Sequence, residues 1–550
     1  MLPVAAPSKV PSAPPPPDDP WRVRRSPLAW IAPTLLAAAL SWPHLFHPLH
    51  HDEIYTIEVF AVDFEHAFLH YHIPNNHILF SALFRIWRLV SDDPAVWRLM
   101  PMSFFLLAAA LTAAAGRRLT GGPLGGWLCG MVFATMHPAL SFGTELRGYS
   151  QSITFSALAL YALVRWRDDS RRRWPLVYGI SAFLGVGSVP TTLAAFAPMV
   201  CWRLGGDWFG RAPRRGLAAR TAWLALTPLM GLVFLLPNWR FLEGGMKAGS
   251  SMAKSTFLWH YPVATLWDFL WLPAAAWALA RLCRGRVPAP DVDGRQIDRD
   301  AGGGAWLRPA LLLICAVLVP MACCLAQRRT PNDYTLSATL PMIALGLGWL
   351  AHALAPRDGR AGAAAALWLG VALAALGVWR EFGAGASRNP FSSNLYAADG
   401  GAADGFNLYF QEYQNNHAPI RLANTLARSF RAYGDQNALV LFWKGDPLPV
   451  RTYWRRLHAA DFPGAALLIV PDDVREFTVD DWRELWRSHP IRIVVCGFTR
   501  PLDPGFFEMV SPEDPGHLVF RKQFWHSYVY RWQPGPAPAP SSTAPSDAPP

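Results

Sequence analysis

A series of long apolar segments, separated by short loops, constrains this chain more than any other feature. Each segment has roughly the 20 residues that an α-helix needs to cross a bilayer. Hydrophobic residues fill 52% of the 550 positions and charged residues only 16%, which is more apolar than soluble domains require. The segments are Pro27–Phe46, 98–116, 122–140, 148–165, 174–189, 190–204, 221–237, 262–283, 306–326, 334–354 and 361–380. We therefore predict a polytopic α-helical membrane protein of about eleven spans.

Arginines mark every second loop between these segments. They lie at Arg117 and Arg118, Arg165 to Arg173, Arg203 to Arg220, Arg281 to Arg299, and Arg357 with Arg360. Because basic residues concentrate in cytoplasmic loops, we interpret the net charge of +11 as a topology signal and exclude nucleic-acid binding. No small-residue cleavage site follows the first arginines, which predicts an uncleaved signal anchor. We expect a multi-pass protein of the cell inner (plasma) membrane, with a cytoplasmic N-terminus and a periplasmic or extracellular C-terminal region.

Composition divides the chain into four parts. Residues 1–26 and 534–550 are Pro-rich tails that cannot pack a core and are predicted to be disordered. Residues 27–380 contain the apolar segments, and 381–533 are predicted to form a globular α/β domain. Its predicted strands are Ala438–Trp443, Ala466–Val470 and Ile493–Cys496, and its predicted helices are Arg421–Tyr433 and Thr478–Arg487. No Gly-rich turn follows any of these strands, so we expect a packing or recruiting role and no nucleotide site.

The first predicted outer loop, residues 44–97, carries two adjacent acids, Asp52 and Glu53. Carboxylates near lipid are costly unless they bind or react with something. The alternative is that both are solvated loop acids that cap the next helix. Apolar residues from Ile57 to Tyr71 fall on one helical face, which predicts a single helix lying in the membrane interface. The following apolar run, Ile78 to Val90, is too short to cross the bilayer.

Two further groups of charged and aromatic residues fall on the same predicted side of the membrane. They are Glu145, Arg147 and Tyr149 before one segment, and Arg328, Arg329 and Tyr334 before another. A guanidinium at an outer interface is suited to a forked contact with a phosphate. Arginines at helix ends also serve as simple interface anchors. The sequence leaves both interpretations open.

Histidines are concentrated in the first outer loop, which holds eight of the 16 in the chain. His66 and His70 have the helical spacing of ligands to a zinc or manganese ion. A metal site needs three or four convergent groups, and titratable side chains are common in interface loops. We therefore predict no cofactor and keep a divalent metal as the alternative.

The order of these motifs resembles the GT-C glycosyltransferases. More narrowly, it resembles their bacterial branch related to protein O-mannosyltransferases and to the lipid A aminoarabinose transferase. The resemblance covers about residues 28–380 and rests on Asp52-Glu53, Pro74-Asn75-Asn76-His77, Trp97-Arg98-Leu99-Met100-Pro101 and Glu145-x-Arg147-x-Tyr149. It implies an inverting enzyme that moves a sugar from a polyprenyl-phosphate carrier to an acceptor outside the membrane. The family's loop acid serves as the base and maps to Asp52, and its arginine-tyrosine element maps to Arg328, Arg329 and Tyr334.

The residue types suit that chemistry. A carrier phosphate is a good leaving group, so one base and a few cationic donors suffice. A retaining mechanism needs two acids at the sugar, and Asp52 and Glu53 cannot both face it from a regular helix. We predict Asp52 as the base and Glu53 as an orienting group, with His77 nearest the sugar or phosphate. The other predicted carrier or substrate contacts are Asn76, Glu145, Arg147, Tyr149, Arg328, Arg329 and Tyr334.

Two functions of other classes remain possible. A lipid or solute transporter would place charges near the membrane midplane, in broken helices with an internal repeat. A non-catalytic envelope assembly protein would use residues 381–533 as a binding surface. For the enzyme, the predicted partners are a polyprenyl-phosphate-linked sugar, membrane lipid, and an extracytoplasmic glycolipid, polysaccharide or protein acceptor, with no nucleic acid.

Overall fold

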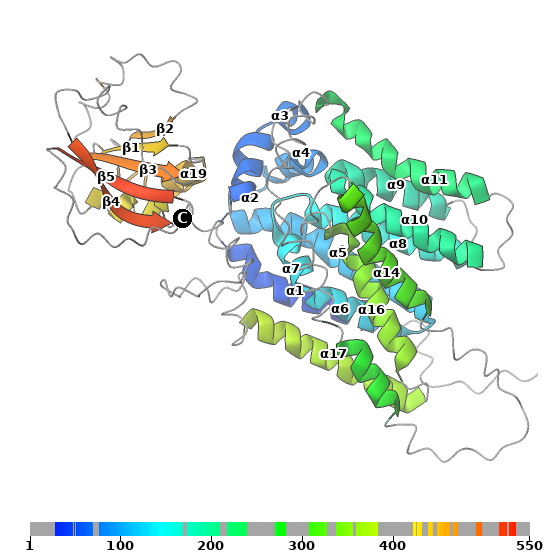
Figure 1. Cartoon of the computed structure of the whole chain (residues 1–550). Coiled ribbons are helices and arrows are strands. Elements are labelled where there is room, and N and C mark those ends of the chain that lie inside the picture. The colour runs from blue at the N-terminus through cyan, green and yellow to red at the C-terminus, as the bar shows by residue number, and fades with distance from the viewer. Residues whose placement is uncertain are drawn as a thin grey trace, which may run out of the picture.

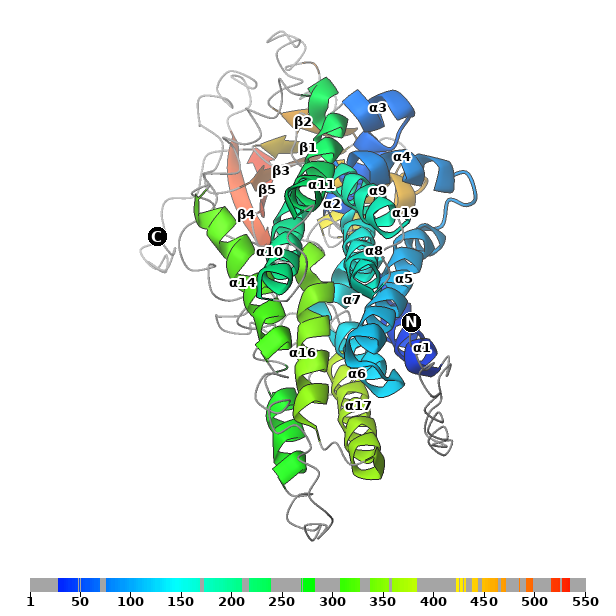
Figure 2. The same ribbon diagram turned by 90° about the vertical axis from the view of Figure 1, so that its right-hand side faces the viewer.

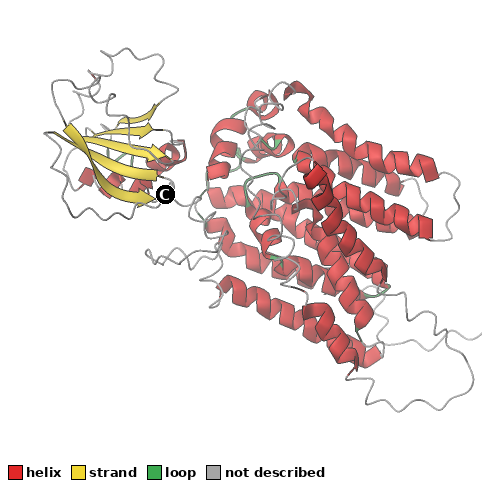
Figure 3. Ribbon diagram, in the orientation of Figure 1, coloured by secondary structure: helices red, strands yellow, loops and turns green. Residues whose placement is uncertain are grey.

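A helical bundle and a separate β-sheet make up the computed structural model of the chain (Figure 1). The structure describes residues 28–47, 49, 51–69, 76–168, 173–209, 217–238, 269, 271–281, 307–326, 337–355 and 359–382 of the helical part. Beyond these it describes 422–424, 426–428, 430–431, 438–443, 448–462, 466–470, 484, 491–497, 516–524 and 527–534. Figure 3 shows that the described strands all lie in the C-terminal part, which also contains helix, whereas the bundle is helical.

The bundle consists of long helices that run roughly parallel to one another (Figures 1 and 2). Its α-helices are α1 (Leu28–Ser41), α5 (Pro94–Thr120), α6 (Pro123–Thr135), α7 (His137–Thr144), α8 (Tyr149–Asp168), α9 (Arg173–Ser188), α10 (Leu193–Phe209), α11 (Leu217–Met230), α14 (Leu307–Ala326), α16 (Leu340–Leu354) and α17 (Gly359–Phe382). Short 3-10 turns extend several of them, namely η1 (Trp42–Phe46), η3 (Pro190–Thr192), η4 (Gly231–Asn238) and η6 (Ser337–Thr339).

Five helical stretches in the described part of the chain are long and apolar enough to cross a membrane. They are Ala29–Phe46, Pro94–Thr120, Ala218–Asn238, Ser337–Leu354 and Ala361–Trp379. Ser337–Leu354 is the most enclosed, with 78% of its residues buried, whereas α11 and α17 carry large exposed apolar side chains such as Leu226 and Trp368. Such side chains suit a lipid environment. The total of about eleven spans stays a prediction.

The predicted span at 122–140 is wrong in one respect, because two helices occupy it. α6 ends at Thr135, Met136 is extended, and α7 begins at His137. Pro138 explains the break, since proline lacks the N–H that would continue the helix and its ring clashes with the preceding turn. The break matters for the site because α7 leads directly into Glu145.

Close backbone packing holds α6 at the centre of the bundle. A Cβ added at Gly348 of α16 would lie 2.6 Å from the Cα of Cys129, and one at Gly130 would lie 2.8 Å from the ring of Pro33. Only glycine permits such an approach between helices. The small residues of α6 therefore let α1, α5 and α16 surround it.

The first outer loop is built from four short helices. They are α2 (His51–Tyr55), the π-helical turn η2 (Thr56–Phe60), α3 (Phe64–Leu69) and α4 (Ile78–Trp87). The predicted single interfacial helix is therefore wrong. The chain breaks before Phe64 because Asp63 caps a new helix, its Oδ1 accepting a hydrogen bond from the His66 N–H at 2.7 Å. Ile57 and Phe60 are buried, whereas Phe64 and Phe68 are exposed.

The C-terminal part contains a five-stranded sheet of order β2-β1-β3-β5-β4. Its strands are β1 (Ala438–Trp443), β2 (Ala466–Val470), β3 (Ile491–Gly497), β4 (Gly516–Phe524) and β5 (Ser527–Pro534). β2, β1 and β3 are parallel, and β5 pairs antiparallel with β3 and β4. Strands lie at the three predicted positions, with β3 two residues longer at its start and one residue longer at its end. The predicted helix at 478–487 lies, apart from Glu484, outside the described residues.

One further helix, α19 (Leu448–Leu457), lies between the sheet and α2 (Figure 1). It was not predicted. Its buried side chains Val450, Tyr453 and Trp454 join Ile54 and Ile57 of the outer loop in one apolar cluster. This cluster is separate from the main core of the bundle. The outer loop is therefore packed between the bundle on one side and α19 on the other.

Candidate active site

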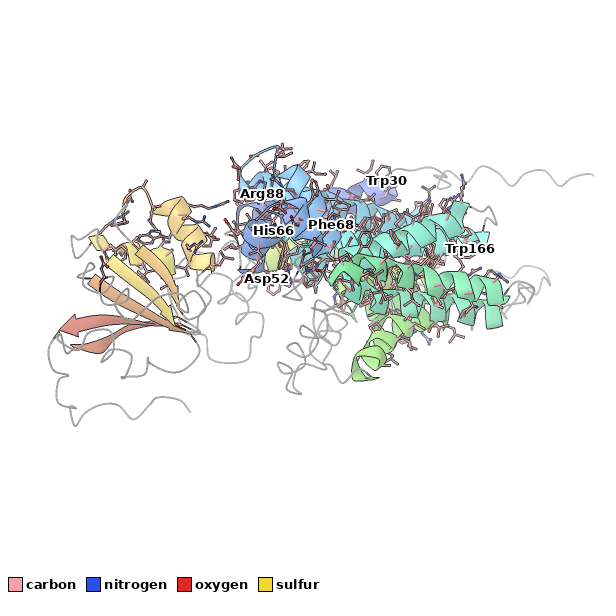
Figure 4. The ribbon with its side chains drawn as sticks, turned by 90° about the horizontal axis from the view of Figure 1, so that it is seen from above. Trp30, Asp52, His66, Phe68, Arg88 and Trp166 are labelled. Atoms are coloured by element: carbon pink, nitrogen blue, oxygen red, sulfur yellow. The ribbon has the colours of Figure 1, made fainter. Side chains whose placement is uncertain are left out.

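Asp52 and Arg147 form an ion pair at the end of the bundle that faces the sheet. Arg147 Nη1 lies 2.7 Å from Asp52 Oδ2. The carboxylate is 26% exposed and the guanidinium only 4%, so the cation is fixed in the protein while the acid faces outward. Figure 4 places Asp52 and His66 at this end of the bundle and Trp166 at the opposite end. Trp166, in the last turns of α8, therefore lies at the other end of the bundle from Asp52.

Glu53 is fully buried and points away from the face that Asp52 occupies. Its two oxygens accept from Arg98, with Nε to Oε1 at 3.1 Å and Nη2 to Oε2 at 2.6 Å. Oε1 also accepts from the Leu146 N–H at 3.0 Å. Arg98 donates in addition to the carbonyls of Leu45 and His47. The expectation that Glu53 orients a bound molecule is therefore revised, since its acceptor positions are occupied by the protein.

The two acids thus connect two different arginines to one short helix. α2 is followed directly by the π-helical turn η2, where Thr56 Oγ1 donates to the Asp52 carbonyl at 3.1 Å. Turns of this type are frequent at functional sites. Asp52 and Glu53 pair with different arginines, and that they cannot both face a bound sugar stays a prediction.

Arg147 is held by its neighbours in the link between α7 and α8. Its guanidinium lies over the ring of Tyr149, 4.7 Å from the centroid. Glu145 Oε2 is 4.0 Å from Nη1 on the same cation. A guanidinium stacked on an aromatic ring loses little freedom when it binds an anion. The predicted Glu145-x-Arg147-x-Tyr149 motif therefore converges on Asp52.

His77 lies beside this group at the start of α4. Its ring meets that of Tyr149 edge to face, with centroids 4.7 Å apart. Burial lowers the pKa of His77 well below its ordinary value of 6.5, and the charge of Arg147 lowers it further against the opposing effect of Asp52. The imidazole is therefore neutral at pH 7.

Asn76 has a structural role in the same turn. Its amide nitrogen donates to the Ala67 carbonyl at 3.0 Å, and its amide oxygen accepts from Ser81 Oγ at 2.9 Å. These bonds tie α3 to α4 and set the position of His77. The predicted contact of Asn76 with substrate stays a prediction.

Three buried polar atoms of residues near Gly148 have no hydrogen-bond partner among the described residues. They are His77 Nδ1, Ser150 Oγ and Gln151 Nε2. Gln151 Oε1 accepts from Ser188 Oγ at 3.1 Å, which connects this group to α9. Leaving such atoms unpaired costs free energy, so they are candidates for contact with a polar ligand or water. Sequence reasoning missed Gln151, although a run of polar residues opening an apolar segment was a visible signal.

Gly148 keeps this polar group compact. A Cβ at Gly148 would lie 2.8 Å from His77 Nδ1 and 2.9 Å from the Ser188 carbonyl oxygen. Neither contact is tolerable for a real side chain. The glycine between Arg147 and Tyr149 therefore allows α4 and α9 to approach the mouth of α8.

Several predicted residues take no part in the described site. Arg328, Arg329 and Tyr334 lie outside the described residues. Of the predicted metal pair, His70 is also outside them, and His66 Nδ1 lies 2.8 Å from both oxygens of Asp63. Hydrogen bonds from His66 lower the pKa of Asp63. Within the described residues, no group of three or more His, Cys, Asp or Glu side chains is arranged to hold a metal ion.

The fold is similar to that of solved structures. ArnT from Cupriavidus metallidurans, in a structure bound to undecaprenyl phosphate, superposes on the chain with a TM-score of 0.50 and 13% identity, covering 92% of this chain and 98% of that one. The apo form of the same protein gives the same values. The chain has the fold of ArnT. The resemblance to GT-C glycosyltransferases predicted from the sequence is thereby confirmed at the level of fold.

The other comparisons are weaker. Oligosaccharyltransferase from Archaeoglobus fulgidus in its apo form reaches a TM-score of 0.39 at 12% identity, covering 85% of this chain and 69% of that one. No protein-family model matches the sequence, and none of the curated proteins does. The apolar helices and the fold shared with ArnT identify a membrane protein.

Proposed function

We propose that the protein is an inverting glycosyltransferase that moves a sugar from a polyprenyl-phosphate carrier to an acceptor outside the membrane. The observation that carries the proposal is the pair of a partly exposed Asp52 and a buried Arg147, 2.7 Å apart at one end of an apolar bundle. A base and a fixed cation are the two groups that the reaction requires. The undecaprenyl phosphate bound to ArnT supports a carrier lipid of this class.

In the proposed reaction, Asp52 is the general base. The acceptor hydroxyl oxygen attacks the anomeric carbon as the bond from that carbon to the phosphate oxygen breaks. The hydroxyl proton passes to the Asp52 carboxylate, and the electron pair of the broken bond leaves with the polyprenyl phosphate. Because attack and departure occur on opposite faces, the anomeric configuration inverts.

Arg147 is proposed to stabilise the charge that develops on the leaving phosphate. Its guanidinium has five N–H donors in a planar fork, so it can contact a phosphate while it remains near Asp52. Stacking on Tyr149 keeps the cation in place before the substrate arrives. A positioned cation in a poorly hydrated site is worth more than the same charge in water.

The unpaired buried atoms around His77 are proposed to receive the sugar. A neutral imidazole both donates and accepts, and Gln151 Nε2 and Ser150 Oγ add donors of the kind that bind sugar hydroxyls. A site built to hydrogen-bond a hydroxyl discriminates strongly against a sugar that lacks it. Arg328, Arg329 and Tyr334 remain proposed carrier contacts.

The placement of the site is also part of the proposal. We take residues 27–380 as the membrane domain, 381–533 as an α/β domain outside the membrane, and 1–26 with 534–550 as tails. The acceptor is then a glycolipid, polysaccharide or protein of the periplasmic or extracellular side. The cell inner membrane is the proposed location.

The direct test is transfer of labelled sugar from a polyprenyl phosphate to extracted envelope acceptors by the detergent-purified enzyme. Product stereochemistry, read by NMR, should be inverted relative to the donor. A transporter would move the lipid or solute across vesicles without forming a covalent product. An assembly protein would bind envelope components with neither transfer nor flux, so either result would contradict the proposal.

A further inference from the structure

Tyr453 of α19 reaches across to the backbone that carries the proposed base. Its hydroxyl donates to the Leu49 carbonyl at 2.5 Å, although 404 positions separate the two residues in the chain. Leu49 lies three residues before Asp52. The Tyr453 side chain is buried, and burial raises its pKa, so the hydroxyl keeps its proton and remains a donor.

Two neighbouring arginines of α19 contact the same part of the outer loop on either side of this bond. Arg455 Nη2 lies 3.1 Å from Glu58 Oε2 on η2. The Arg456 guanidinium lies over the ring of Trp97 at the start of α5, 5.2 Å from its centroid. α19 therefore contacts η2, which follows Asp52 in the chain, and the start of α5.

Arg98 also holds the backbone that leads into α2. Arg98 donates to the carbonyls of Leu45 and His47 and pairs with Glu53. Leu45, His47 and Leu49 thus all accept hydrogen bonds from distant side chains. Because α2 is only five residues long, it cannot hold its own position and depends on these contacts.

We propose that α19 of the C-terminal region is a positioning element for Asp52, with Tyr453 as its principal positioning residue. The inference rests on the proposed role of Asp52 and deepens it. It assigns the C-terminal region a part in catalysis, because loss of the Tyr453 bond releases the Leu49 to Asp52 backbone. A displacement of about 1 Å in a catalytic group is enough to lower turnover about 100-fold.

The alternative is that α19 merely adheres to the loop and adds stability. Tyr178 provides a matched control, because its buried hydroxyl also donates to a backbone carbonyl, that of Leu224, at 3.0 Å. Tyr178→Phe and Tyr453→Phe remove the same atom from a buried side chain that donates to a backbone carbonyl. Only the second bond lies next to Asp52, so the two variants separate a positioning role from a stabilising one.

The first experiment compares these variants in the purified full-length enzyme. We expect Tyr453→Phe to lower kcat about tenfold with KM for the carrier lipid unchanged, while Tyr178→Phe keeps kcat. Hydrogen exchange should accelerate in residues 47–58 of Tyr453→Phe and not in α6. Normal kcat in Tyr453→Phe, or equal losses in both variants, would overturn the proposal.

A second experiment tests the docking through charge. Arg455→Glu places two carboxylates opposite each other at Glu58, and adding Glu58→Gln removes the repulsion. We expect Arg455→Glu to lower kcat several-fold and to speed exchange in residues 47–58, and the double variant to recover both. Failure of the second substitution to rescue would contradict the docking. Hydrogen exchange can be measured on a protein without activity. If the wild type transfers no sugar, the proposed function is refuted, and hydrogen exchange still tests whether α19 holds residues 47–58 in place.

Discussion

Removing Arg98 should destabilise the protein more than any other change at the site. Arg98→Ala leaves the Glu53 carboxylate buried without its cation, and it also removes donors from the carbonyls of Leu45 and His47. Breaking a buried ion pair from one side costs about 3–5 kcal/mol. Native proteins are stable by only about 5–15 kcal/mol, so the loss is a large fraction of the total.

Removing both charges of the pair should recover part of that loss. In the double variant Arg98→Met with Glu53→Gln no charge is buried, and Gln still accepts from the Leu146 N–H, so the cost should be smaller than that of Arg98→Ala, with the lost donors to the Leu45 and His47 carbonyls remaining. Glu53→Gln alone should lie between the two. Unfolding in mixed detergent micelles, followed by tryptophan fluorescence, measures all three. If Arg98→Ala is as stable as the wild type, or if the double variant is less stable than Arg98→Ala, the buried pair does not hold the loop as described.

Three further predictions concern the neighbouring residues. Arg147→Lys loses the forked contact and should raise KM for the carrier lipid about tenfold in transfer assays; an unchanged KM would place the phosphate elsewhere. Gly148→Ala should cost about 1–3 kcal/mol in unfolding experiments, unlike Gly122→Ala, where no atom lies within 4 Å of the added Cβ. Because the folded pKa of His77 is depressed, the unfolded state binds the extra proton below pH 6.5, so stability should fall as the pH drops through that value. His77→Gln should flatten that pH dependence, and an equally steep profile would show that another group titrates.

The sequence predicted those elements whose apolar residues are continuous. β1, β2 and β3 are parallel strands that contain unbroken apolar runs, the run in β3 being Ile493–Cys496, and all three were located. β4 and β5 were missed because their apolar runs are short and are interrupted by charged residues such as Arg521 and Arg531. α19 was missed although Val450, Tyr453 and Trp454 have the spacing of a helical face.

The outer loop shows why the site was only partly predictable. Charge at the mouth of an apolar segment indicated Asp52 and Arg147, and the structure brings them together. Nothing local in the sequence indicates that Glu53 turns inward, because its partner Arg98 lies 45 positions away. Apolar periodicity likewise predicted one helix from Ile57 onward, since it does not register the cap at Asp63 that starts a second helix.

The central claim is that Asp52 takes the proton of the acceptor, and Asp52→Asn tests it most directly. Asparagine keeps the size of the side chain and its place beside Arg147, but it is no longer a base. Sugar transfer from polyprenyl phosphate should fall about 10²–10⁴-fold, with carrier binding and the unfolding midpoint close to those of the wild type. Near-normal turnover in a well-folded Asp52→Asn enzyme would contradict the claim.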